Sequence, residues 1–214
     1  MINTWLKRLL SLAIAMLVLA GCAMTSTYNQ SYLAAARRPV AVQADGKALI
    51  VTSPEDDAYV YTGRPTSFSG SATTLTLPLG AIVKESATAA FADALKGGAD
   101  ASNAIKDADR YTVIVAPKLA SFSYEYNQLK NIGFAITPTA SVVVDVRILD
   151  AEGATRWQRS YISGPVEGPA YMLNTSPQEE ISKVAHKALY DLFSAAAADV
   201  ARGAASKATG AAAQ

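Results

Sequence analysis

The sequence predicts an α+β fold in which a mostly antiparallel sheet carries two amphipathic helices on one face, as a two-layer sandwich. Two segments, 79–96 and 177–193, repeat apolar residues with the 3.6-residue period of a helix. The segments before and between them are shorter, rich in Val, Ile, Thr and Tyr, and bounded by Gly, Pro and Asp. This order of strands, helix, strands and helix indicates one sheet packed beneath both helices.

The expected strands differ in how much of their surface is apolar. The first, Lys47–Ser53, is apolar on both faces, which favours a central place in the sheet. The longest, Thr139–Asp150, places apolar residues on one face, namely Ala140, Val142, Val144, Val146 and Ile148. A turn at Asp150–Gly153 then returns the chain antiparallel through 154–163. Further strands are expected at 59–61, 73–77, 111–116 and 119–126, with Pro117 ending the third of these.

The two helices have recognisable ends. The first, Leu79–Lys96, is followed by Gly97-Gly98, which is typical of a helix C-terminus. The second follows Ser176-Pro177-Gln178-Glu179, a capping box with proline at the first helical position. Its apolar stripe is Ile181, Val184, Ala185, Ala188, Leu189, Leu192 and Phe193.

The N-terminus has the pattern of a secretory signal. Lys7 and Arg8 precede the apolar run Leu9–Ala20. Twelve helical residues span about 18 Å, which is less than the roughly 30 Å of a bilayer core. We therefore expect residues 1–21 to be a signal peptide and not a membrane span.

The signal ends in Leu19-Ala20-Gly21-Cys22, which resembles the complete lipobox of bacterial lipoproteins. This resemblance implies cleavage before Cys22, a diacylglyceryl thioether on its sulfur and an acyl chain on its amino group. Each buried methylene contributes about 0.8 kcal/mol, so three chains anchor a protein stably in a bilayer. Ala23 in place of aspartate favours the outer membrane, facing the periplasm, with the inner membrane as the alternative.

The rest of the chain divides into three parts. Residues 22–45 lack sustained periodicity and are expected to be a lipid-anchored tether, or alternatively a segment that orders on a partner through Tyr28 and Tyr32. Residues 46–194 form the expected α+β periplasmic domain. Residues 195–214 are rich in alanine and are expected to be a poorly ordered tail.

Composition excludes several classes of function. Removal of the signal leaves 193 residues, enough for one domain, with 17 basic against 18 acidic residues. Without a basic excess, nucleic acid is not an expected partner. Cys22 is the sole cysteine, so lipidation leaves no thiol for a disulfide or a metal site.

No arrangement of residues indicates catalysis, a metal or a cofactor. His186 is the only histidine, and its place in the second helix predicts a partly exposed side chain with no ligand role. The acidic run Glu55–Asp57, even with Asp107 and Asp109, lacks the spacing of a calcium loop. The protein is therefore not expected to be an enzyme, and a hydrolase whose carboxylates meet only in the fold is the less favoured alternative.

Two groups of residues are candidates for binding a partner protein. Phe122, Tyr124 and Tyr126 lie on one face of a strand, where aromatic side chains are either interface anchors or core residues under a helix. Tyr171 and Met172 lie in a loop with Gly and Pro, and loops often carry function.

The whole outline resembles small envelope lipoproteins of the YajG type. It is also similar to auxiliary lipoproteins of transport and secretion systems, including the curli-secretion lipoprotein family. The matching features are the lipobox at Cys22, the helix from Leu79 and the hairpin 139–163 with Gly153 in its turn. The resemblance implies a non-catalytic binding or accessory component of an envelope transport, secretion or assembly complex. A structural or peptidoglycan-associated lipoprotein, with the tail from Ala195 as a contact, is the alternative.

Overall fold

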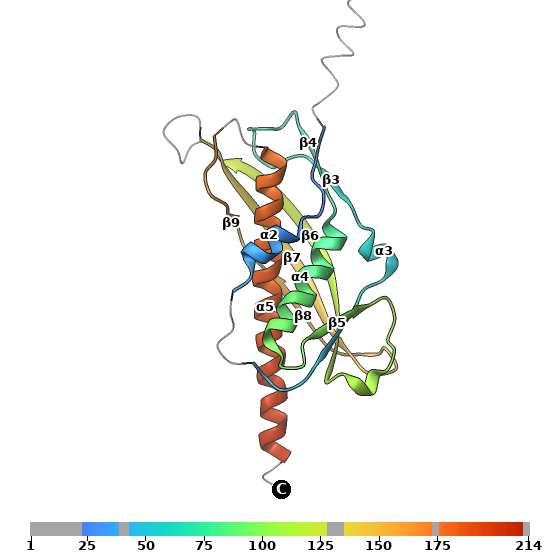
Figure 1. Cartoon of the computed structure of the whole chain (residues 1–214). Coiled ribbons are helices and arrows are strands. Elements are labelled where there is room, and N and C mark those ends of the chain that lie inside the picture. The colour runs from blue at the N-terminus through green and yellow to red at the C-terminus, as the bar shows by residue number, and fades with distance from the viewer. Residues whose placement is uncertain (1–22, 39–42, 128–134, 173–175, 212–214) are drawn as a thin grey trace, which may run out of the picture.

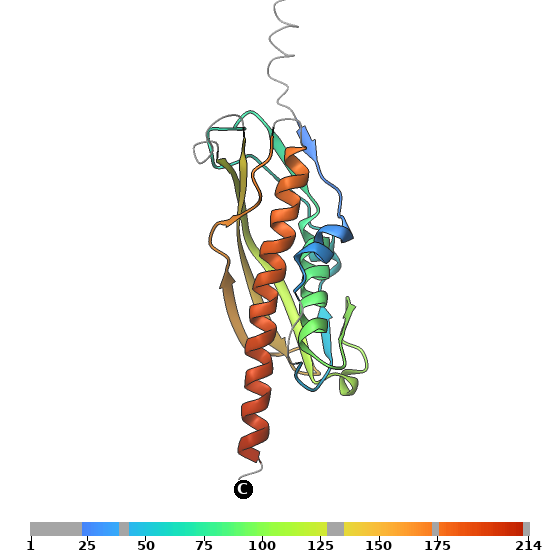
Figure 2. The ribbon, with the colours of Figure 1, turned by 60° about the vertical axis from the view of Figure 1, so that its left-hand side comes forward.

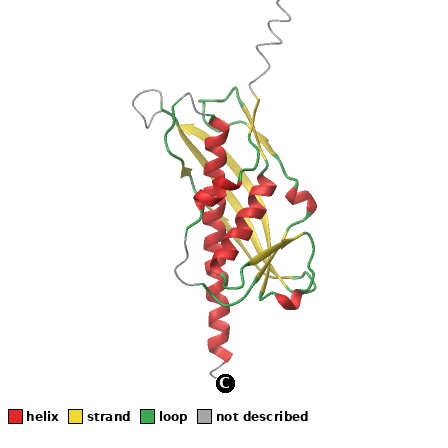
Figure 3. Ribbon diagram, in the orientation of Figure 1, coloured by secondary structure: helices red, strands yellow, loops and turns green. Residues whose placement is uncertain are grey.

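The computed structural model describes residues 23–38, 43–127, 135–172 and 176–211, with side chains as far as Arg202. The chain combines helices and strands (Figure 3). Their bounds are β1 (Ala23–Thr25), α2 (Gln30–Ala36), β2 (Ala48–Val51), α3 (Pro54–Asp57), β3 (Tyr61–Gly63), β4 (Thr74–Leu77), α4 (Leu79–Ala94), β5 (Ala99–Ser102), a 3₁₀ turn (Ala108–Arg110), β6 (Val113–Asn127), β7 (Thr137–Leu149), β8 (Thr155–Ile162), β9 (Val166–Glu167) and α5 (Pro177–Ala211).

The main sheet has the strand order β5-β2-β6-β7-β8, with β9 also paired to β7. Strand β2 runs parallel to both of its neighbours, β5 and β6, whereas β6, β7, β8 and β9 pair antiparallel. The apolar first strand is central, as its composition predicted. The predicted α+β class, with mostly antiparallel strands, is confirmed.

Helices α4 and α5 lie side by side on one face of this sheet (Figures 1 and 2). Their predicted apolar stripes are buried and meet the inward-facing residues of β7, of which Ala140, Val142, Val144 and Val146 are 1 % exposed or less. The periodicity of 3.6 on the helices and of 2 on the strands therefore located the core correctly.

Strand β6 is longer than predicted, because Pro117 does not end it. Pro117 lies opposite Val146 of β7, and the pairing continues to Asn127 opposite Thr137. A register shift between Leu119 and Ser121 leaves Ala120 without a partner on β7, which is the pattern of a β-bulge. A proline beside an irregularity of this kind is tolerated in a sheet.

The segment 22–45, expected to be an unstructured tether, contains regular structure from Ala23 onward. Strand β1 pairs in parallel with β4, and β4 pairs with β3, so that a second sheet of three strands forms. Helix α2 begins at the Asn29 cap, whose side chain accepts a hydrogen bond from the backbone N–H of Ser31, and it buries Leu33. These elements are too short to show periodicity, and their partners are distant in sequence. The expectation of a tether is therefore wrong for the residues that form β1 and α2.

The expected tail is also helical, because α5 continues without a break to Ala211. Ala196 and Ala197 are buried, and the carboxylate of Asp199 accepts hydrogen bonds from Arg159 and Tyr161 of β8 at 2.7 and 2.9 Å. The last turns of α5 extend past the sheet (Figure 2). A further difference is β5, which forms in a polar stretch where a strand was not expected, by pairing with β2.

Within the described residues, no helix is both long enough and apolar enough to cross a membrane. The signal peptide and Cys22 lie outside the described residues.

Candidate binding groove beside strand β6

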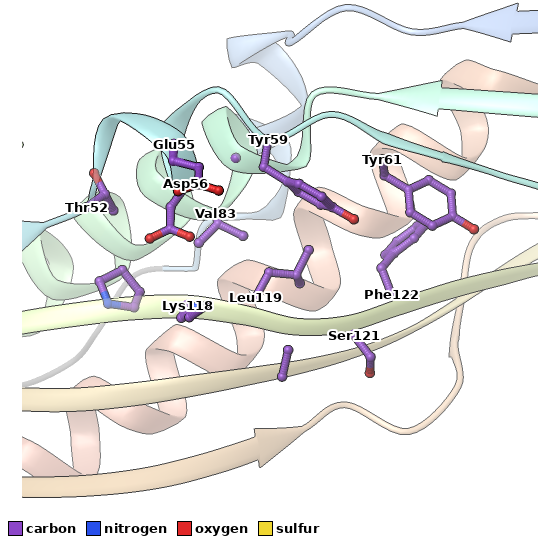
Figure 4. A pocket seen from close by; sticks show the side chains of 13 residues that line it. Thr52, Glu55, Asp56, Tyr59, Tyr61, Val83, Lys118, Leu119, Ser121 and Phe122 are labelled. Atoms are coloured by element: carbon purple, nitrogen blue, oxygen red, sulfur yellow. The ribbon is translucent and has the colours of Figure 1, made fainter.

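A groove of about 490 Å³ lies between β6 and the segment that runs from the end of β2 through α3 to β3 (Figure 4). One wall consists of six consecutive residues of β6, Pro117–Phe122. The other wall includes Thr52, Glu55, Asp56, Tyr59 and Tyr61, and α4 contributes Gly80 and Val83. The volume is within the range of about 300–1,000 Å³ that is typical of ligand sites.

The edge of β6 that faces this groove is not covered by another strand. Strand β2 pairs with β6 only through Val113–Val115. The next contact on that edge is the backbone N–H of Thr66, which donates to the carbonyl of Tyr124 at 2.8 Å. Between these contacts no described segment pairs with the backbone on the groove side, and Lys118, Ala120 and Ser121 are exposed.

The wall opposite β6 is held rigidly against α4. The hydroxyl of Ser53 accepts a hydrogen bond from the N–H of Asp56 at 3.0 Å and caps α3. Lys84 forms an ion pair with Asp57 at 2.7 Å, and the N–H of Gly80 donates to the carbonyl of Tyr59 at 2.8 Å. A Cβ at Gly80 would lie 2.1 Å from the Asp56 carbonyl oxygen, so this close approach requires glycine.

Aromatic rings line one end of the groove. The rings of Tyr61 and Phe122 meet edge to face with their centroids 4.9 Å apart. Tyr59 is 46 % exposed, and Figure 4 shows it between the α3 end and the Tyr61–Phe122 pair. Burial raises the pKa of the Tyr61 hydroxyl, which therefore stays neutral and can donate or accept a hydrogen bond. Such rings offer apolar contact area with a polar tip.

The other end of the groove is polar. Glu55 is exposed, and the carboxylate of Asp56 accepts a hydrogen bond from Ser53 at 2.7 Å. Thr52 is 3 % exposed, and its hydroxyl has no hydrogen-bond partner among the described residues. Lys118 stands on the facing strand (Figure 4). The groove thus joins an aromatic end to an end that carries both signs of charge.

The aromatic row predicted on β6 divides between this groove and the core. Phe122 is half-buried and lines the groove, whereas Tyr124 and Tyr126 are 1 % and 6 % exposed. The hydroxyl of Tyr124 donates to the Gly63 carbonyl at 3.2 Å, and burial raises the pKa of both tyrosines. The aromatic residues of this strand were expected to be either core residues or interface anchors. Tyr124 and Tyr126 are core residues, whereas Phe122 is accessible from the groove.

The two loop candidates also differ in burial. Tyr171 is 7 % exposed and exchanges backbone hydrogen bonds with Ile136, and burial raises its pKa to about 12. Met172 is 55 % exposed. The structure brings neither of them to the groove, and their role in partner binding stays a prediction.

His186 was expected to be partly exposed, and that expectation is wrong. The side chain is fully buried, and the ring centroids of Tyr28 and Tyr32 lie 5.6 and 5.7 Å from the centroid of its imidazole ring. Its Nδ1 donates to the Ser182 carbonyl at 2.7 Å, because a carbonyl oxygen can only accept. Burial lowers the pKa of the imidazole. The reason for the error is α2, which covers this part of α5 and was not predicted.

Among the described residues, no three His, Cys, Asp or Glu side chains gather closely enough to hold a metal ion. Of the acidic residues considered as a cation site, Asp57 forms an ion pair with Lys84, and Asp107 forms one with Arg110 at 3.8 Å. The residues that the structure does bring together at the groove, Tyr59, Tyr61 and Thr52, were not predicted as site residues. The alternation Tyr59-Val60-Tyr61 was the one available signal, since it placed two aromatic rings on the same side of a short strand.

Comparisons with known proteins place the fold. The sequence matches no protein-family profile and no curated protein. Among solved structures, the chain is similar to a Xanthomonas campestris protein of the DUF330 family, with 12 % identity, a TM-score of 0.51 and coverage of 87 % of this chain and 98 % of that one. At this identity the similarity shows the fold alone.

Weaker similarities are to bacterial lipoproteins. A candidate lipoprotein from Caulobacter crescentus shows 16 % identity over 60 % of this chain and 84 % of its own, with a TM-score of 0.41. A minor lipoprotein from Acinetobacter baumannii shows 14 % identity over 73 % and 93 %, with a TM-score of 0.35.

Proposed function

We propose that the protein is a membrane-anchored periplasmic lipoprotein that binds another envelope protein, without catalysis, through the groove beside β6. The observation that carries this proposal is the groove itself, a cavity of about 490 Å³ lined by accessible aromatic rings and by an uncovered strand edge. Accessible tyrosine and phenylalanine side chains are enriched at protein interfaces.

The anchor is proposed from the lipobox at Cys22, with an outer-membrane location favoured by Ala23. Ala23 is also the first residue of β1, which pairs with Thr74 of β4. No spacer therefore separates the acylated residue from the folded domain. A domain anchored in this way is held close to the bilayer surface, because its first strand begins directly after the acylated residue. A partner that binds it must also lie near that surface.

The chemistry of the groove favours binding over catalysis. Its carboxylates, Glu55 and Asp56, are neighbours on α3, where Glu55 is exposed and Asp56 accepts a hydrogen bond from Ser53. His186 is buried beneath α2 and is not a lining residue of the groove. The groove offers hydrogen bonds, apolar contact and charge, which are the means of recognition.

Site-specific photocrosslinking in living cells tests the proposal. The crosslinker p-benzoylphenylalanine replaces Tyr59 in the groove or, as a matched control, Trp157, which is 38 % exposed on β8. We expect one discrete crosslinked product from position 59 and not from position 157. Absence of a product from both positions, or the same products from both, would contradict binding at the groove.

The anchor has a separate test. Cys22→Ser removes the acylated sulfur, and we expect the protein to move from the membrane fraction to the soluble fraction. The crosslink at position 59 should then weaken, because the partner is no longer brought to the same surface. A Cys22→Ser protein that stays in the membrane fraction would contradict the lipid anchor and leave the groove proposal to its own test.

A further inference from the structure

We infer that the groove takes an extended segment of the partner, which adds to the free edge of β6 as a further strand. This inference rests on the proposed function and names the conformation and chemistry of the occupant. It starts from the gap in the sheet, which is bounded at both ends by segments that do pair with β6. Those segments are β2 at Val115 and the Thr66–Ser67 stretch at Tyr124 and Tyr126.

The gap has the dimensions of one short strand. Six residues of β6 line the groove, and at about 3.3 Å per residue they span roughly 20 Å. An extended segment of five to seven residues fills that length. A helix, about 10–12 Å across with its own backbone groups satisfied internally, would leave the edge of β6 unpaired.

The backbone of β6 supplies the hydrogen-bonding groups that such a strand needs. Along a strand, successive residues point their N–H and C=O groups to opposite edges. The Tyr124 carbonyl accepts from Thr66 on the groove side, so alternation directs the backbone groups of Phe122 to the same side. Ala120 is the bulged residue with no partner on β7, and it is exposed. The backbone N–H and C=O groups on this edge can pair with an extended chain, whereas a compact ligand cannot pair with groups spread along the strand.

The side chains around the gap define which residue types the partner segment carries. Tyr59, Tyr61 and Phe122 provide an aromatic contact surface at one end (Figure 4). Glu55 and Asp56 stand at the other end. Every second side chain of an added strand faces the same way. The segment that fits has an apolar or aromatic residue beside Tyr61 and a Lys or Arg beside α3.

The probe for this inference is a library of random seven-residue peptides displayed on phage, selected on the full mature chain. The tightest peptide is synthesised with single N-methyl groups at each position in turn, because N-methylation removes one backbone donor. We expect at least a tenfold loss of affinity at alternate positions and little change at the positions between them. Equal losses at all positions, or no selected peptide, would overturn strand addition.

Amide hydrogen exchange and one pair of variants complete the test. Peptide binding should slow the exchange of amides within Lys118–Phe122 at least tenfold. Ala120→Pro changes the backbone at the bulge, in the middle of the free edge, and should weaken the peptide at least tenfold. Ala151→Pro, in the β7–β8 turn where proline is compatible, is the matched control and should bind like the unmodified chain. Unchanged exchange, or tight binding to Ala120→Pro, would overturn the inference.

The two proposals fail in different ways. If the Tyr59 crosslink forms but exchange at β6 is unchanged and N-methylation shows no alternation, the groove binds a partner through side chains and strand addition is wrong. If the crosslink is absent, the proposed function itself is wrong. Circular dichroism and unfolding midpoints establish that each variant is folded before its affinity is compared.

Discussion

The two long strands at the centre of the sheet differ in how their outer edges are covered. The outer edge of β7 is closed along its length by β8, then by Ser163, whose N–H donates to the Val142 carbonyl at 3.0 Å, and then by β9. Tyr171 completes this edge by exchanging backbone hydrogen bonds with Ile136. Described segments of the chain close the outer edge of β6 only at its two ends. An uncovered strand edge is a template for pairing with another chain, so the difference supports the proposal that a partner segment adds to β6.

The difference has its origin in the connections of the chain. Strand β8 follows β7 through a tight turn at Gly153, whose φ is +86°, and the chain then continues along the same edge through β9. The edge of β6 is instead covered by two segments far away in sequence, β2 and Thr66–Ser67. After β2 the chain turns into α3, which packs on α4 and not on β6.

The largest expected effect comes from removing a ring that is buried beside the closed edge. Tyr171→Ala should lower the free energy of unfolding by about 3–5 kcal/mol, because a buried aromatic ring is lost and leaves a cavity. Urea unfolding measures this. Tyr171→Phe is the control and should not be destabilised, because it keeps the ring and removes a buried hydroxyl that has no hydrogen-bond partner among the described residues. A loss below about 1 kcal/mol for Tyr171→Ala would mean that this ring is not packed in the core.

Acid should loosen the helical layer that covers the sheet. Burial lowers the pKa of His186 in the folded state, so the unfolded state binds more protons around and below the ordinary pKa of about 6.5. The stability due to neutral His186 is complete above that pH and is lost as the pH falls. Urea midpoints at pH 7.5 and 5.0 should show the fall, and His186→Phe should remove part of it. An equal fall in the variant would contradict the assignment.

Removal of the unpaired hydroxyl at the polar end of the groove should stabilise the free protein. Thr52→Val keeps the shape of the side chain and removes a buried polar group that has no partner, for a gain of about 1 kcal/mol in the free energy of unfolding. Thermal or urea unfolding measures the change. Thr52→Ser, which keeps the hydroxyl and loses a methyl group, should be destabilised instead. A destabilised Thr52→Val would show that the hydroxyl is satisfied in solution.

The smallest effect on stability is expected at the accessible ring of the open edge. Tyr59→Ala should change the free energy of unfolding by no more than about 0.5 kcal/mol, because the side chain is 46 % exposed. The same substitution should abolish most of the binding to the selected peptide, measured by fluorescence anisotropy. This separation of stability from binding is the opposite of that expected for Tyr171. A Tyr59→Ala protein that binds normally would place the anchor point elsewhere in the groove.

Local patterns predicted much of the framework. The two apolar stripes located α4 and most of α5, and the alternation from Ala140 to Val146 identified the buried face of β7. Gly153 and Asp150 marked the hairpin correctly, and Asp150 accepts a hydrogen bond from the N–H of Ala154 at 2.7 Å. These features depend on interactions between residues close in sequence, or on burial that repeats with the period of the element.

Errors occurred where the stabilising partner lies far along the chain. Strand β1 depends on β4, α2 depends on α5, and β5 depends on β2. His186 was misjudged for the same reason, since the rings that bury it come from Tyr28 and Tyr32. None of these short segments has enough residues to show a period, so no window of the sequence indicated them.

The candidate site shows the same division. Composition and the lipobox at Cys22 by themselves predict an anchored domain of binding type, because a signal and a missing catalytic motif are properties of adjacent residues. The free edge of β6 is different, since it is defined by where two segments from elsewhere in the chain, β2 and Thr66–Ser67, stop pairing with it. Pairing along a strand is a contact between distant parts of the chain, and a gap in that pairing has no local sequence pattern. The groove therefore became visible only when β2, α3 and β6 were placed together in space.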